Sequence, residues 1–84
     1  MDANEIRAAV KNSIAKVTGI NAQEISDEAS YKEDLGLDSL SIIEIAVDVE
    51  CRFRVKASDE ELSAIRTVAD TVRLLQQYLG AKVT

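Results

Sequence analysis

Apolar residues recur every three or four positions in three segments of this 84-residue chain, and no proline interrupts any of them. That spacing places apolar side chains along one face of an α-helix, whereas a half-buried strand would alternate apolar and polar residues. In the first segment the apolar positions are Ala3, Ile6, Val10, Ile14 and Val17. The pattern predicts a helix over residues 3–17, begun by a capping box between Asp2 and Glu5 and ended by Gly19.

A long connection separates this helix from the next one. Residues 19–37 show no sustained apolar period, and loops of this length are typically functional or internally packed. The residues expected to pin it to the core are Ile20, Ile25, Tyr31 and Leu35. After the loop, Asp38 is placed to cap a second helix over residues 39–53.

The C-terminal part of the chain predicts two more helices. The S-x-x-E sequence at Ser58 begins a short helix near residues 59–64. A last helix is expected to run to about Leu79 and to end at Gly80. The predicted fold class is therefore all-α, with three longer helices, one short third helix and a long loop between the first two. We expect residues 1–84 to form a single domain.

Missing residue types exclude several functions. The chain has no histidine and one cysteine, so it can form neither a Ser-His-Asp or Cys-His catalytic site, nor an internal disulfide, nor a histidine- or cysteine-based metal cluster. Its longest apolar run is three residues, far below the roughly 20 that span a membrane, and no signal peptide is visible. The net charge of −5 disfavours nucleic acid. We expect a cytoplasmic domain with positively charged protein partners.

The negative charge is concentrated in the middle of the chain. Residues 19–38 hold six acidic residues and one lysine, and residues 39–63 are also net acidic, whereas both ends are mildly basic. Such a cluster is either a set of solvated loop and helix faces or a docking surface for a basic partner. Charge alone leaves both interpretations open.

The helix predicted over residues 39–53 has apolar residues on two faces. Its core stripe consists of Ile42, Ile45, Ala46, Val49 and Phe53. On roughly the opposite side lie Leu40, Ile43, Val47, Glu44, Asp48 and Cys51. Either the helix is buried all round, or this second side is an exposed, acid-rimmed apolar surface of the kind that binds other proteins. The acidic middle of the chain favours the second interpretation.

The sequence DLGLDSL, residues 34–40, leads into this helix. Ser39 falls in the first helical turn, where unpaired backbone N–H groups and the helix dipole favour an anion, so a phosphate esterified to its hydroxyl would be well placed. Gly36 allows the backbone to turn sharply before the helix. Taken alone, Asp-Ser before an apolar run is typical of an ordinary helix cap.

In its wider context the chain resembles the acyl carrier proteins. DLGLDSL is similar to that family's prosthetic-group attachment motif, and the resemblance runs from the first helix through SYKEDLGLDSL and SDEEL to the closing helix. It implies a four-helix bundle in which Ser39 carries covalent 4′-phosphopantetheine, transferred from coenzyme A. Asp38 corresponds to the acidic residue important for the transferase encounter. Leu40 corresponds to the apolar residue that partners contact.

The resemblance implies a carrier rather than an enzyme. A thiol at the end of the prosthetic arm would hold acyl groups as thioesters, and the protein would tether them near each docked enzyme. The predicted docking residues are Leu40, Ile43, Glu44, Val47 and Asp48. The implied partners of a monomeric carrier are a phosphopantetheinyl transferase, a ketosynthase, an acyltransferase and other biosynthetic enzymes with basic docking patches. We expect no bound metal and no membrane span.

The chain departs from housekeeping fatty-acid carriers along the second helix. Ser41 stands where an acidic residue is common, and Cys51 and Arg52 occupy positions that are often acidic. Arg54 adds another positive charge, and Ser58 replaces a frequent proline. We therefore predict a dedicated partner set in discrete polyketide or specialised fatty acid biosynthesis. Two alternatives stay open: an aminoacyl carrier of the D-alanyl type, and a helical adaptor that never carries a prosthetic group.

Overall fold

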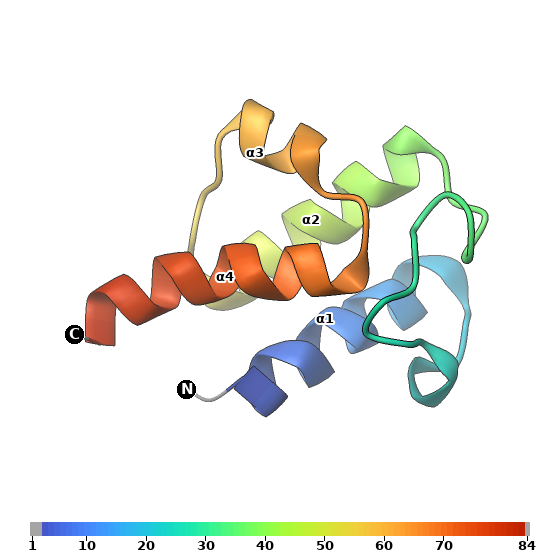
Figure 1. Cartoon of the computed structure of the whole chain (residues 1–84), viewed down its shortest axis with the longest axis horizontal. Coiled ribbons are helices and arrows are strands. Elements are labelled where there is room, and N and C mark those ends of the chain that lie inside the picture. Colours follow the sequence, from blue (N-terminus) through green and yellow to red (C-terminus); the bar gives the residue numbers. More distant parts are fainter. Residues whose placement is uncertain (1–2, 84) are drawn as a thin grey trace.

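The computed structural model describes residues 3–83, which form four α-helices and one short 3-10 helix (Figure 1). The elements are α1 (Ala3–Thr18), η1 (Ala22–Glu24), α2 (Ser39–Phe53), α3 (Asp59–Ala64) and α4 (Val68–Val83). The predicted all-α fold, with three longer helices, a short third helix and a long first loop, is confirmed. Within the part of the chain that the structure describes, no helix is both long enough and apolar enough to cross a membrane.

The core lies between α1, α2 and α4, because each of these helices turns one apolar stripe inward. Helix α1 contacts both α2 and α4, and in Figure 1 α4 passes in front of α2 with α1 below it. The buried apolar side chains of the three helices include Ile6, Val10, Ile14, Ile42, Ile45, Val49, Val68, Val72 and Leu75. Each contributes roughly 1.5–3 kcal/mol when it leaves water. The predicted stripes of α1 and α2 are confirmed, with Val17 and Phe53 partly buried at their ends.

Apolar residues pack the long loop after α1 onto the bundle, as the sequence predicts. Ile25 and Tyr31 are buried, and Ile20 and Leu35 are partly buried. The Tyr31 hydroxyl shares a hydrogen bond with Thr71 Oγ1 of α4 at 2.5 Å. This bond satisfies two polar groups that burial would otherwise leave unpaired.

Backbone hydrogen bonds also fix the end of the loop. The Tyr31 N–H donates to the Arg66 carbonyl at 3.0 Å, and the Leu37 N–H donates to the Tyr31 carbonyl at 2.8 Å. The loop is therefore held at the start of α4 while it turns toward α2. This attachment of the loop to the start of α4 determines where the first residue of α2 lies.

Local signals set most of the helix ends. Gly19 follows α1 with a φ of 82°, as its predicted role requires. At the start of α3, Ser58 and Glu61 form the predicted capping box, with each side chain accepting from the backbone of the other. The capping box predicted at Asp2 lies outside the described residues.

The predicted end of α4 at Gly80 is wrong. The helix continues through this residue to Val83. A glycine inside a helix costs about 1 kcal/mol relative to alanine, but it keeps its backbone N–H and does not break the helix as proline does. With no proline after Gly80, the helical hydrogen bonds can continue.

Candidate functional site

Ser39 is the first residue of α2, and it is exposed. The residues before it determine where α2 begins. Asp38 has an extended backbone, and its Oδ1 accepts a hydrogen bond from the Ser41 N–H at 2.9 Å, which confirms the predicted N-cap. Gly36 turns the chain just before the cap with a φ of 67°. Ser39 therefore lies at the end of the helix where the dipole is positive.

The Ser39 hydroxyl has no hydrogen-bond partner in the part of the chain that the structure describes. The neighbouring Asp38 carboxylate serves as the helix cap, and the Ser41 backbone N–H lowers the pKa of this carboxyl by stabilising its charged form. Asp38 is thus ionised at neutral pH and committed to backbone N–H groups. A serine hydroxyl is a weak nucleophile without an adjacent base.

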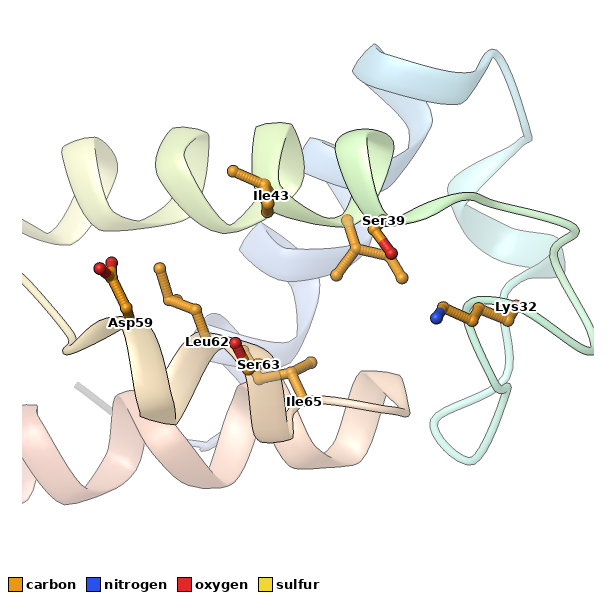
Figure 2. Close-up of a pocket in the computed structure, with 8 residues that line it drawn as sticks. Lys32, Ser39, Ile43, Asp59, Leu62, Ser63 and Ile65 are labelled. Atoms are coloured by element: carbon orange, nitrogen blue, oxygen red, sulfur yellow. The ribbon is translucent and has the colours of Figure 1, made fainter.

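A surface cleft of about 410 Å³ lies beside Ser39, between the first half of α2 and α3 (Figure 2). The apolar side chains that line it are Ile42, Ile43, Leu62 and Ile65. Two charged residues also line it, Lys32 from the long loop and Asp59 from the start of α3. In Figure 2 the Lys32 ammonium and the Ser39 hydroxyl oxygen are turned toward the same space. The cleft is thus apolar along its walls and charged at its two ends.

The sequence patterns predict neither a role for Lys32 nor the cleft. The cleft depends on how α3 lies across the bundle, which no local pattern encodes. A signal for the lysine does exist in the sequence, because Lys32 is the only basic residue between Lys16 and Arg52. A single cation in an acidic segment that leads into a functional motif is a candidate for binding an anion.

The outer face of α2 carries an exposed apolar strip formed by Leu40, Ile43 and Val47. Their relative exposures are 64%, 49% and 47%. Glu44 and Cys51 are exposed as well. The strip confirms that α2 has a second, solvent-facing apolar side, so the alternative of a helix buried all round is wrong. Ile43 belongs both to this strip and to the wall of the cleft.

The structure places Asp48 at the edge of this face rather than beside the strip. Its carboxylate pairs with Lys16 of α1, Oδ1 to Nζ at 3.2 Å, and approaches Arg52 with Oδ2 to Nε at 3.8 Å. Only about a quarter of the Asp48 side chain is exposed, at 24%. Leu40, Ile43, Glu44 and Val47 therefore form the open face, and Asp48 connects it to α1.

Comparison with known proteins gives a consistent family match. The family model described as "Phosphopantetheine attachment site" matches residues 8–75. The meromycolate extension acyl carrier protein of Mycobacterium leprae is 47% identical over 73 residues, which cover 87% of this chain and 64% of that protein. The acyl carrier protein of Thermotoga maritima is 37% identical over 76 residues, covering 90% of this chain and 94% of that protein. The chain thus spans less than two thirds of the mycobacterial relative.

Solved structures resemble the fold over nearly its whole length. A putative acyl carrier protein from Anaplasma phagocytophilum has a TM-score of 0.80 and 30% identity, covering 93% of this chain and 92% of that one. A putative acyl carrier protein from Mycobacterium tuberculosis has a TM-score of 0.81, covering 87% of this chain and 97% of that one. Its identity is 22%, so this second likeness shows the fold alone.

Proposed function

The chain belongs to the phosphopantetheine-binding acyl carrier protein family, and from this premise we propose that Ser39 is the residue that bears its 4′-phosphopantetheine. The matching domain indicates that this group is covalently attached. The single observation that carries the assignment is the exposed Ser39 hydroxyl, without a partner among the described residues, at the start of α2. Such a hydroxyl is accessible to an incoming transferase, and the helix start favours the phosphate that it would bear.

The described residues around Ser39 suit an attached phosphodiester. The backbone at the start of α2 presents N–H groups without intrahelical partners, and the cleft beside Ser39 offers room for an arm. When bound, the group supplies a thiol that holds an acyl chain as a thioester. Asp38 holds the start of α2 in place, and it presents a carboxylate beside Ser39 to a basic transferase. The chain itself positions the prosthetic group and presents it to partner enzymes. It acts as a carrier rather than as a catalyst.

The apolar strip is the proposed docking surface for partner enzymes. Leu40, Ile43 and Val47 provide a small apolar contact area, and Glu44 adds a carboxylate on the same face. Small interfaces of this kind bind weakly, and complementary charge makes the encounter fast. Both properties suit a carrier that must leave one enzyme for the next. The partners are a phosphopantetheinyl transferase, a ketosynthase and an acyltransferase with basic docking patches. Asp48, at the edge of this face, contributes mainly by fixing α2 to α1.

The pathway is proposed to be a specialised one, in fatty acid or discrete polyketide biosynthesis. Arg52 and Arg54 place exposed positive charge at the end of α2, so a partner with a uniformly basic patch would meet repulsion there. The Mycobacterium leprae relative is named a meromycolate extension acyl carrier protein, which favours an acyl over an aminoacyl cargo. The mass of the acyl group on protein isolated from its native host would identify the cargo.

Attachment at Ser39 is tested by intact mass measurement. After incubation with coenzyme A, magnesium and a broad-specificity phosphopantetheinyl transferase, we expect the wild type to gain one phosphopantetheine and Ser39→Ala to gain none. Ser41→Ala is the matched control. It removes a hydroxyl two residues away and keeps the backbone N–H that donates a hydrogen bond to Asp38. A wild type that stays unmodified would leave only the adaptor interpretation. An equal gain on Ser39→Ala would move the attachment to another residue.

A further inference from the structure

We propose that Lys32 binds the phosphodiester that joins the prosthetic arm to Ser39, and that it thereby directs the arm into the cleft between α2 and α3. The inference rests on the proposed attachment at Ser39 and assigns a positioning role to a residue of the long loop. Lys32 and Ser39 line the same cleft, and Figure 2 shows the ammonium and the hydroxyl turned toward one another across it.

The backbone on both sides of Lys32 is held by the fold. Before it, the buried Tyr31 donates its N–H to the Arg66 carbonyl at 3.0 Å. After it, the N–H groups of Asp34 and Leu35 both donate to the Ser30 carbonyl at 3.0 Å. The base of the lysine side chain is therefore fixed, and only its methylene stem must order when an anion binds. A fixed base reduces the entropy lost on binding.

The charge of Lys32 is available for an anion. Arg7, Lys11 and Lys16 each form an ion pair with an aspartate, whereas Lys32 forms none with the residues that the structure describes. Among the described residues, Lys32 is also the only cation that lines the cleft, and Asp59 lies at the other end. A phosphodiester on Ser39 is attracted toward Lys32 and repelled by Asp59, so its arm has a preferred direction.

The walls of the cleft suit the rest of the arm. Pantetheine combines a branched dimethyl group with two amides, and the cleft combines apolar walls with polar groups near α3. Ile43 and Leu62 can contact the dimethyl group, and the Ser63 hydroxyl and Asp59 carboxylate can accept hydrogen bonds from amide N–H groups. The chemical class of the ligand is therefore an amphipathic phosphodiester, bound in its own protein's cleft.

The test uses protein loaded with pantetheine that carries carbon-13 in its dimethyl group. Solution NMR measures the order of these methyl groups and their contacts with Ile43 and Leu62. We expect Lys32→Gln to lower the ratio of docked to free arm about fivefold, which is about 1 kcal/mol, the upper range for an exposed ion pair. Lys32→Arg keeps the charge and is expected to retain most of the docked arm.

Arg54→Gln is the matched control, because it removes the same charge from an exposed residue at the other end of α2. It is expected to leave the arm as ordered as in the wild type. The proposal is overturned if Lys32→Gln leaves methyl order and contacts unchanged, or if Arg54→Gln reduces them equally. Intact mass distinguishes the role of Lys32 from the attachment at Ser39. If Lys32→Gln carries phosphopantetheine and its arm is as ordered as in the wild type, only the role of Lys32 is refuted. If the wild type carries no phosphopantetheine, the attachment itself is refuted.

Discussion

Arg54 ends α2 in a backbone conformation that few residues adopt. It follows Phe53 with φ 56° and ψ 43°, and its N–H donates to the Glu50 carbonyl. Glycine is the usual residue at such a helix end, because the left-handed conformation brings a Cβ too close to the following carbonyl oxygen. The arginine thus lowers stability at this position while adding an exposed positive charge to the end of α2.

Arg54→Gly is expected to stabilise the fold. The left-handed conformation costs a residue with a Cβ about 1–2 kcal/mol, and the extra freedom of glycine in the unfolded chain offsets roughly 0.5–1 kcal/mol of that. The unfolding free energy in urea should therefore rise by about 0.5–1 kcal/mol. Arg54→Ala serves as the control, since it removes the same side-chain charge and keeps the Cβ. An equal rise in Arg54→Ala would assign the effect to charge and not to the backbone.

Individual residues were predictable from the sequence where their role is local. The caps at Asp38 and Ser58 act within three residues, so short patterns identified them correctly. The sequence does not place Lys32 at the cleft, because only the folded loop brings it there. Helical spacing predicts that Asp48 lies on the docking side of α2, whereas its contact with Lys16 joins residues 32 positions apart. Contacts of that range require the packed bundle.

At the scale of elements, α3 is the most weakly held helix of the described bundle. It has six residues and none of them is buried. Leu62 packs partly against the core, and the Tyr78 hydroxyl of α4 donates to Glu61 Oε1 at 2.5 Å. Beneath it lies an apolar void of only about 10 Å³, lined by residues of α2, α3 and α4.

Hydrogen exchange should reveal this difference between helices. The amide protons of α3 are expected to exchange faster than those at the centres of α1, α2 and α4, because local opening of α3 exposes little apolar surface. Tyr78→Phe removes the bond to Glu61 and should speed exchange in α3 a further threefold to tenfold. Exchange in α1 is the internal control. If α1 accelerates by the same factor, the substitution has lowered global stability and α3 does not open on its own.

Element boundaries were predictable to the extent that their signals are local. The bounds of α2 and α3 agree with the prediction because an N-cap begins each helix. The end of α4 was misplaced because Gly80 lacks a following proline that would stop the helix. The position of α3 beside the cleft could not be predicted, since it depends on contacts that form only in the fold, such as the bond between Tyr78 and Glu61.

At the scale of the whole molecule, paired carboxylates link distant segments. Asp27 of the long loop binds α1 through Arg7 Nε at 2.9 Å and Lys11 Nζ at 2.5 Å, and the hydrogen bond from Lys11 lowers the pKa of its carboxyl. Burial raises the pKa of Asp70, but the N–H groups of Arg66 and Thr67 outweigh it and the net direction is down. Charged carboxylates therefore stabilise the fold despite a net charge of −5.

These shifts predict how stability depends on pH. A carboxyl whose folded pKa lies below its ordinary value of 3.8 contributes stability that is present above that value and is lost as the pH falls through the folded pKa. The pKa shift of Tyr31 has the opposite sign, because burial raises the pKa of its hydroxyl from 10.0 to about 12. Its contribution is present below pH 10 and is lost as the pH rises toward 12. We expect a stability plateau between about pH 5 and 9, with a decrease on each side.

Urea unfolding followed by circular dichroism across this pH range measures the plateau directly. At about 0.15 M salt, repulsion between exposed carboxylates is screened beyond about 8 Å. Below pH 5, the loss of ion pairs therefore lowers the unfolding free energy more than the relief of repulsion raises it. Asp27→Asn should flatten the acid decrease, and Tyr31→Phe should flatten the alkaline one while costing about 1–2 kcal/mol near neutrality. Stability that rises as the pH falls from 5 to 3 would contradict this account, because repulsion would then dominate. The net charge of −5 would in that case weaken the fold.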